Sequence, residues 1–353
     1  MVTPNQKNKA DLLLKLHEDK EILILLNSWD PGSSKLMEAS GLKAIGTTSM
    51  GVSASLGYPD CQAIPFEEMV DAITKITDKV TIPVSADIEG GFGKNINEIV
   101  ESTGKIISTG IVGINIEDSL ELNPLLLDET EFCERISAIR SLSDSLGFHL
   151  VINARTDVFL TGWGKSENRL TETIRRGNKY RKAGADCIFV PGVSEEDKIK
   201  TLVREIDAPV NILVNPTIEG TGSPLSISML EDLGVARVSF GASLMKATLA
   251  MTKKIVSEVM QNGTYNILFE NLNPLSETLK AYKMAKELEK TAKKNKYVRL
   301  YIDNIKRTEE NWQQHKPKSQ QFSDLIDEVI NVKPFLTPRR TRRGSLMKVI
   351  RSQ

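Results

Sequence analysis

Residues 181–190 read Arg-Lys-Ala-Gly-Ala-Asp-Cys-Ile-Phe-Val, and this stretch predicts a helix end, a glycine and a strand in that order. Glycine just past a helix end adopts the left-handed conformation at little steric cost and so closes the helix. The run Cys187–Val190 is apolar without alternation, which is typical of a strand buried on both faces of a parallel sheet. The same order recurs at Ser40-Gly41, Thr109-Gly110 and Leu233-Gly234, so the chain repeats one helix–strand unit.

Short apolar runs of this kind alternate with amphipathic helical stretches through most of the chain. The expected strands are Ile22–Leu26, Ala44–Thr47, Pro83–Asp87, Gly113–Glu117, Leu150–Ala154, Cys187–Val190, Val210–Val214 and Val235–Phe240. Expected helices include Phe66–Lys79, Ile96–Thr109, Glu129–Ser145 and Thr171–Lys182. Eight such units predict an α/β fold, a (β/α)8 TIM-type barrel. The rival is an open doubly wound sheet, which usually carries G-x-G-x-x-G after its first strand, whereas Leu26–Asp30 contains no glycine.

Charge divides the chain into a body and an appendage. Residues 271–353 contain 19 Lys and Arg against 9 Asp and Glu, and residues 1–270 contain 27 against 37. We expect a barrel domain over 1–265, a helical extension over 266–332 and a basic, disordered tail over 333–353. The tail has no interleaved aromatic residues and no known nucleic-acid motif, so we expect no nucleic-acid partner.

The cysteines and the apolar runs bear on the cellular setting. Cys61, Cys133 and Cys187 lie far apart, which predicts neither a disulfide framework nor a cysteine zinc site. No apolar run approaches the roughly 18 residues of a membrane span, and the first residues are polar. We therefore expect a cytoplasmic protein without a membrane partner.

In a barrel of this type, function lies just after the strands, at their carboxyl ends. The acidic residues expected there are Asp60, Asp87, Glu89, Glu117 and Asp118. Carboxylates brought together repel one another unless a cation joins them, and oxygen ligands without Cys or His favour Mg²⁺, with Mn²⁺ as the alternative. Another interpretation is that one or two of these acids, Asp118 above all, cap helices.

Arg155 ends an apolar strand, where a guanidinium requires a charged partner. It either binds a substrate carboxylate or phosphate, or forms an internal salt bridge with Asp157 or Glu117, and both can hold. The run Thr47-Thr48-Ser49 either binds a carboxylate or forms a turn with local side-chain bonds. The three histidines do not follow strands, which argues against a histidine general base.

Five ordered motifs resemble the isocitrate lyase/phosphoenolpyruvate mutase superfamily, in particular its phosphonomutase-like branch. They are Asn27–Asp30, Thr47–Asp60, Ser85–Gly93, Gly113–Asp118 and Asn153–Asp157. The likeness covers roughly residues 10–265. It implies a barrel enzyme that cleaves or forms a C–C or P–C bond next to a 2-oxo acid, through an enolate held by Mg²⁺.

The resemblance also implies roles for single residues. Asp60, Asp87 and Glu117 match the metal-site acids, and Arg155 matches the arginine that binds the substrate carboxylate. Thr47, Thr48 and Ser49 match the turn that grips the oxo acid. We add Trp29 and Asn215 to the substrate contacts because both follow predicted strands, and we name Arg155, Glu117 and Asp60 as catalytic.

Two departures from the superfamily pattern limit the reaction. Ser85 stands where an Asp-x-Asp pair is common, and Glu89 restores the missing charge as a further metal ligand. The segment Ser119–Pro124 lacks both the cysteine of the isocitrate-type lyases and the lysine of the mutases. We expect a Mg²⁺-dependent C–C lyase acting on a small 2-oxo acid or carboxylate. The alternatives are a P–C bond enzyme and a non-catalytic oxo-acid binder, and the resemblance implies a homo-oligomer.

Overall fold

The computed structural model describes residues 2–119, 125–214 and 225–271, and its strands form one parallel sheet. The strands are β1 (Leu23–Leu25), β2 (Asn27–Ser28), β3 (Ile45–Thr47), β4 (Val84–Asp87), β5 (Gly113–Glu117), β6 (Val151–Arg155), β7 (Cys187–Val190), β8 (Val210–Leu213) and β9 (Arg237–Ser239). Their order in the sheet is β1-β9-β8-β7-β6-β5-β4-β3-β2. Because β1 and β2 are separated by Leu26 alone, the two edges of the sheet belong to one stretch of chain.

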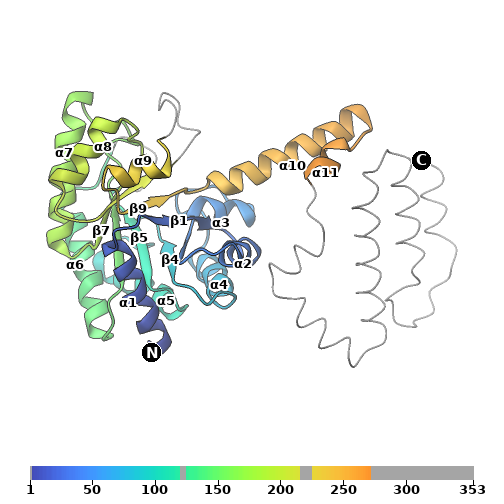
Figure 1. Ribbon diagram of the computed structural model, residues 1–353. Helices are drawn as coiled ribbons and strands as arrows, with labels where there is room; N and C mark the ends of the chain where they lie inside the picture. Colours follow the sequence, from blue (N-terminus) through green and yellow to red (C-terminus); the bar gives the residue numbers. More distant parts are fainter. Residues whose placement is uncertain (1, 120–124, 215–224, 272–353) are drawn as a thin grey trace. The chain divides into compact units, whose positions relative to one another are not determined.

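This interrupted first strand brings the two edges of the sheet together. β1 pairs with β9, and β2 pairs with β3, each in parallel. The nine strands thus form a nearly closed barrel of the TIM type surrounded by helices (Figure 1), which confirms the predicted fold class. Each expected strand is present, with ends that differ by at most two residues.

Helices follow the strands in the order expected of repeated βα units. They are α1 (Pro4–Glu18), α2 (Pro31–Ala39), α3 (Ser49–Ser55), α4 (Phe66–Thr77), α5 (Ile96–Ser108), α6 (Glu129–Ser145), α7 (Ser166–Ala183), α8 (Glu196–Glu205), α9 (Ile227–Asp232), α10 (Ser243–Asn262) and α11 (Asn266–Asn271). The start expected at Thr171 for α7 is wrong, since the helix begins five residues earlier. Its first residues are polar and charged, so the apolar spacing used for the prediction did not reach them.

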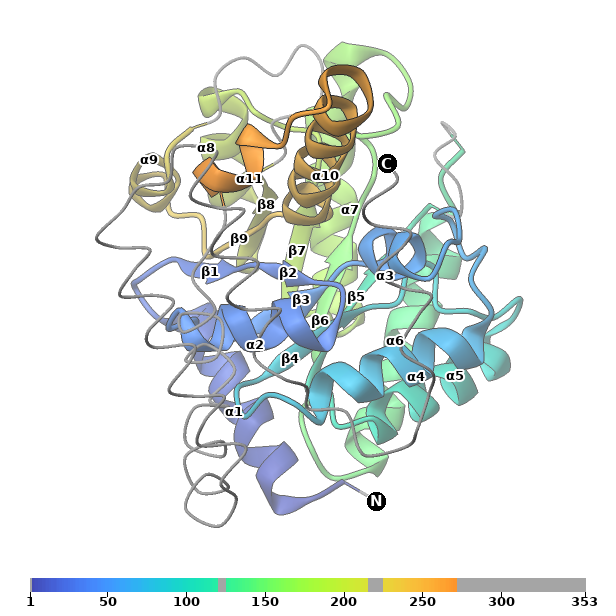
Figure 2. The same ribbon diagram turned by 90° about the vertical axis from the view of Figure 1, so that its right-hand side faces the viewer.

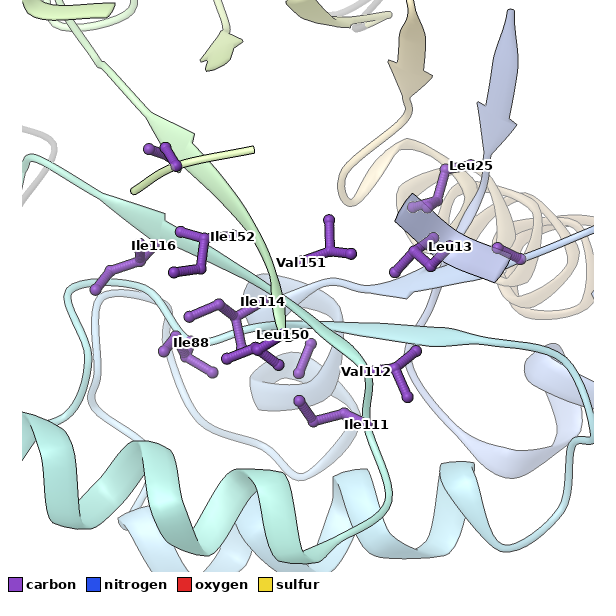
Figure 3. Close-up of a cluster of buried hydrophobic side chains, with 14 of the residues drawn as sticks. Leu13, Leu25, Ile88, Ile111, Val112, Ile114, Ile116, Leu150, Val151 and Ile152 are labelled. Atoms are coloured by element: carbon purple, nitrogen blue, oxygen red, sulfur yellow. The ribbon is translucent and has the colours of Figure 1, made fainter. Parts of the chain in front are cut away.

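The core has two parts because side chains alternate between the faces of each strand. On β5, Ile114 and Ile116 belong to the buried apolar core, while Asn115 and Glu117 carry polar contacts on the opposite face. Figure 3 shows Ile114 with Ile152 of β6, its register partner, among the buried apolar side chains. The polar row of the strands therefore faces the interior of the barrel and ends at the carboxyl side.

Helix α1 covers the barrel from the amino-terminal side of the strands. Its Leu13 side chain packs directly against β5, since a Cβ on Gly113 would lie 2.8 Å from Leu13 Cδ2. Gln6 Nε2 donates hydrogen bonds to Ile107 O at 2.9 Å and Ile111 O at 2.8 Å, which ties the helix to the segment before β5. The carboxyl ends of the strands are left for the site.

Contacts divide the chain into two units, Met1–Glu270 and Asn271–Gln353. Within the first unit, α10 buries only Met245 of its twenty residues, and Figures 1 and 2 show this helix beyond the carboxyl ends of the strands. The predicted helical extension and basic tail fall almost wholly outside the described residues. Among the helices that the structure does describe, none has the length and apolar character needed to cross a membrane.

Candidate functional site at the carboxyl ends of the strands

Asp87, the last residue of β4, is held by three donors from neighbouring elements. Its Oδ2 accepts hydrogen bonds from Ser49 N at 3.0 Å and Ser49 Oγ at 2.8 Å, and its Oδ1 accepts one from Asn115 Nδ2 at 3.0 Å. Its own backbone N–H donates to Thr47 Oγ1 at 2.9 Å. The carboxylate is thus fixed between β3 and β5: Ser49, which the sequence placed after a strand, holds Oδ2, and Asn115, in the middle of β5 and not predicted, holds Oδ1.

The guanidinium of Arg155 is fixed from two sides at the end of β6. Arg155 Nε and Nη2 donate to Asp157 Oδ1 and Oδ2 at 2.6 and 2.9 Å, and Arg155 Nη1 lies 2.6 Å from Glu117 Oε2. This last contact is an ion pair rather than a hydrogen bond, and Glu117 Oε2 has no hydrogen-bond partner among the described residues. Both predicted salt-bridge partners are therefore present.

Exposure separates the residues of this group that a ligand can reach from the one that it cannot. The side chains of Arg155 and Glu117 are 16% and 13% exposed, whereas Asp157 is 0% exposed. Burial lowers the pKa of Arg155, but Asp157 and then Glu117 outweigh it and leave the pKa above its ordinary value. Arg155 is a permanent cation, reachable at one edge.

Two further acids, Asp60 and Glu89, lie close enough to Asp87 to interact electrostatically with it. Burial, and next the charge of Asp87, raise the pKa of Asp60. The same causes, with Asp60 added, raise the pKa of Glu89 to about 8. Burial also raises the pKa of Glu117 well above its ordinary range, although Arg155 opposes the shift. The side chains that were predicted to be neighbours therefore interact electrostatically, and acidic side chains outnumber basic ones among them.

Glu89 has an unusual backbone and an incompletely paired side chain. Its φ of 51° is in the left-handed region, which is uncommon for a residue other than glycine. Gln62 N donates to its Oε2 at 2.7 Å, while its buried Oε1 has no hydrogen-bond partner among the described residues. A buried carboxylate oxygen without a donor is costly, so this atom is suited to a cation or a ligand donor.

Asp118 is not a helix cap, and that interpretation from the sequence is wrong. Its carboxylate accepts hydrogen bonds from Thr156 Oγ1 at 2.8 Å, Asp157 N at 2.9 Å and Tyr180 Oη at 2.7 Å, and Arg176 Nη1 lies 3.1 Å away. Asp118 is fully buried. It anchors the segment after β6 rather than lining the barrel mouth, because its side chain follows the opposite face of β5 from Glu117.

The hydroxyl run after β3 divides between the two interpretations left open by the sequence. Thr48 Oγ1 accepts from Gly51 N at 3.4 Å and caps α3, which is the local-bonding interpretation. Thr47 and Ser49 instead contact Asp87, as described above. Trp29 is partly buried against the core, at the start of α2. The predicted substrate contacts of all four residues remain predictions.

One predicted site residue lies outside the described residues, and three residues that contact the site were not predicted. Asn215 lies outside the described residues, as do residues 120–124 after β5. Asp157, Arg176 and Tyr180 were not among the predicted site residues, although they control Arg155 and Asp118. The sequence did carry a signal for Arg176 and Tyr180. They are four residues apart in a predicted helix, so they lie on the same side of it.

The donor set is compatible with a hard divalent cation. Asp60, Asp87, Glu89 and Glu117 offer oxygen atoms only, and the unpartnered Glu89 Oε1 is one of them. In the part of the chain that the structure describes, no three His, Cys, Asp or Glu side chains are already arranged as a metal centre. Mg²⁺ usually keeps several of its waters, and carboxylates that bind through water need not converge on one point.

This barrel matches a known protein family. The family model described as phosphoenolpyruvate phosphomutase matches residues 13–260. The chain belongs to this family. Membership in the phosphoenolpyruvate phosphomutase family confirms the resemblance to the isocitrate lyase/phosphoenolpyruvate mutase superfamily, whose homologues are enzymes that act on C–C or P–C bonds.

Individual members of the phosphomutase family and its superfamily resemble this chain over most of the barrel. An uncharacterised protein from Mycobacterium tuberculosis is 35% identical over 227 residues, which cover 64% of this chain and 80% of the relative. A 2-methylisocitrate lyase from Aeropyrum pernix is 25% identical over 269 residues, covering 74% and 83%. A solved structure named as a lyase or mutase, from Burkholderia cenocepacia, is 31% identical with a TM-score of 0.72, covering 79% and 96%.

Proposed function

We propose that this protein is a Mg²⁺-dependent lyase that cleaves a C–C bond adjacent to a small 2-oxo acid, by way of an enolate. The observation that carries the proposal is the orientation of Arg155. Two of its five N–H groups donate to Asp157, and Nη1 forms an ion pair with Glu117 without donating to its Oε2, so N–H groups remain for a ligand at a side chain that is 16% exposed. A fixed guanidinium edge with two donors matches the two oxygens of a carboxylate.

The acidic side chains beside Arg155 support the proposal that an anionic product binds together with a cation. Asp87, Glu117, Asp60 and Glu89 are the residues that would hold Mg²⁺ and its waters. When bound, the ion would supply positive charge that stabilises the oxygen of a developing enolate. Ser49 N and Oγ, which already donate to Asp87, hold that carboxylate in place between β3 and β5.

The charge balance and the relatives favour a carboxylate substrate and C–C cleavage. In the described part of the rim, Arg155 is the only arginine paired with the site acids, and both of its partners are carboxylates. A phosphonate dianion carries more negative charge than a carboxylate, and Arg155 is already paired with two acids. The relative from Aeropyrum pernix is itself named as a C–C lyase, 2-methylisocitrate lyase.

The test is a substrate panel with purified protein and Mg²⁺. Malate-type adducts, including 2-methylisocitrate and 2,3-dimethylmalate, are incubated beside oxaloacetate and phosphonopyruvate, and the release of pyruvate or another 2-oxo acid is followed. We expect turnover of at least one C–C adduct and its loss on chelation. Consumption of phosphonopyruvate alone would assign the protein to P–C chemistry, and binding without turnover would make it a binder.

Two substitutions at the site give this test its internal check. Asp87→Ala should abolish the Mg²⁺-dependent signal, because it removes the carboxylate at the centre of the acidic group. Arg155→Lys should raise KM at least tenfold, since lysine cannot offer two parallel donors. Lys182→Gln, at an exposed residue of α7, is the control and should change neither value. Full activity of Asp87→Ala would refute the metal assignment.

A further inference from the structure

Three residues of α7 carry polar side chains into the protein rather than into solvent. Glu172, Arg176 and Tyr180 are spaced four apart, so they lie on one side of the helix. Arg176 is 6% exposed and Tyr180 is 0% exposed. Arg176 Nε donates to Glu172 Oε1 at 2.8 Å, which holds the guanidinium towards the interior.

Arg176 and Tyr180 both contact the buried carboxylate of Asp118. Tyr180 Oη donates to Asp118 Oδ2 at 2.7 Å, and Arg176 Nη1 does so at 3.1 Å. Arg176 Nη1 also lies 3.1 Å from Leu127 O, and Leu127 N donates to Asp118 O at 2.7 Å. The helix therefore fixes Asp118 together with the chain that leads into α6.

Asp118 in turn fixes the backbone at the end of β6. Its other oxygen accepts the hydrogen bond from Asp157 N at 2.9 Å, and Oδ2 also accepts one from Thr156 Oγ1 at 2.8 Å. The carboxylate of Asp157 then accepts the two hydrogen bonds from Arg155 and one from Ser119 Oγ. Each link is a hydrogen bond between buried or nearly buried groups, where such bonds constrain geometry most strongly.

We infer that Arg176 and Tyr180 are positioning residues for Arg155, acting through Asp118 and Asp157 to set the guanidinium edge that receives the substrate carboxylate. The role in substrate binding rests on the proposed function, while the positioning of the side chain does not. If Tyr180 served packing alone, its ring would suffice, since it meets the ring of Phe132 edge-on at 4.7 Å. The hydroxyl group is what the inference requires.

The first test measures the side chain of Arg155 directly. In protein labelled with ¹⁵N-arginine, the Nε–H signal of Arg155 is assigned by its loss in Arg155→Lys, and its rate of exchange with water is measured. Tyr180→Phe keeps the ring and removes the donor, and it should speed this exchange at least about tenfold because the Asp157 bond opens more often. Arg176→Lys should act in the same direction, and Lys182→Gln, at an exposed residue of the same helix, should not.

The second test asks whether the effect reaches a ligand. Oxalate with Mg²⁺ is the probe, because its two planar carboxylates resemble an enolate. Tyr180→Phe should weaken oxalate binding roughly tenfold and leave Mg²⁺ affinity within about twofold.

A double-mutant cycle separates positioning from a general structural role. In protein that already carries Arg155→Lys, adding Tyr180→Phe should change oxalate affinity by less than about twofold, because the group that it positions is gone. Equal effects in both backgrounds would overturn the inference. So would an unchanged exchange rate of the Arg155 Nε–H in folded Tyr180→Phe and Arg176→Lys.

The two tests also fail in different ways. If the unaltered protein does not bind oxalate with Mg²⁺, the proposed function loses its support, while the exchange rate still decides whether Tyr180 and Arg176 position Arg155. If oxalate binds and the exchange rate does not respond, the proposed function stands and the positioning role is refuted.

Discussion

His17 shows how one buried residue makes stability depend on pH. Its Nδ1–H donates to Leu13 O at 2.8 Å, so its Nε2 carries a lone pair, and that atom lies 3.4 Å from Arg237 Nη1. A proton on Nε2 would face a guanidinium at close range in the interior of the protein. Burial, and next the charge of Arg237, lower the pKa of His17 to about 4.

We predict that acidification destabilises the protein through His17. Between pH 6.5 and about 4 the unfolded chain binds a proton at this residue and the folded protein does not, so the free energy of unfolding falls as pH falls. The shift corresponds to about 3 kcal/mol, all of it lost by about pH 4. Urea unfolding at a series of pH values measures it. His17→Gln should flatten the profile in this window, and an unchanged slope in that variant would contradict the assignment.

The chemical roles of single residues could be predicted more completely than the contacts between residues. Arg155 was predicted both to bind a ligand and to pair with Asp157 or Glu117, and the structure shows both pairs. The role of Asp118 was mistaken, because a sequence shows that an acid follows a strand but not which face of that strand it continues. Two of its four donors come from α7, 58 and 62 residues away, and hydrogen bonds over such separations are set by tertiary packing.

At the scale of the elements, strands were predicted closely and their interruptions were not. Apolar runs such as Gly113–Glu117 mark buried strands because both faces of the sheet are covered. No pattern in the sequence predicts the break at Leu26. The break arises because β1 pairs with β9 while β2 pairs with β3. That break depends on closure of the barrel, which is a property of all the strands together.

The turn after β7 lies very close to the backbone of the segment before α7. Gly192 has a φ of 85°, and a Cβ there would lie 2.8 Å from Leu160 N and 2.9 Å from Leu160 Cα. Gly41 has a similar φ of 93° with no atom within 4 Å of that position. The two glycines share a backbone conformation and differ in the space around them.

This pair predicts two different costs for the same substitution. Gly41→Ala should lower the free energy of unfolding by roughly 1 to 2 kcal/mol, the cost of a side chain in the left-handed region. Gly192→Ala should lower it by about 3 kcal/mol or more, because backbone atoms of the segment before α7 must also move. Chemical denaturation of both variants measures the difference, and equal losses would show that the turn can relax.

At the scale of the whole molecule, α10 presents an apolar stripe to solvent. Leu249, Val256 and Met260 are 54%, 54% and 79% exposed, and their spacing of seven and four residues places them on one side of the helix. Exposed apolar surface of this kind usually marks an interface. A homo-oligomer, expected from the family resemblance, would cover the stripe with a second copy of the chain, since most soluble oligomers are symmetric assemblies of one chain.

We predict that this stripe carries self-association. Val256→Asp combined with Met260→Asp places two charges in the contact, so the mass in solution should fall towards the 39.2 kDa of one chain, as measured by sedimentation velocity over a range of concentrations. Lys254→Asp, on the opposite side of α10, changes charge without touching the stripe and should leave the mass unaltered. A single-chain mass for the unaltered protein at high concentration would contradict the prediction. Dissociation by Lys254→Asp alone would show that charge, rather than the apolar stripe, holds the copies together.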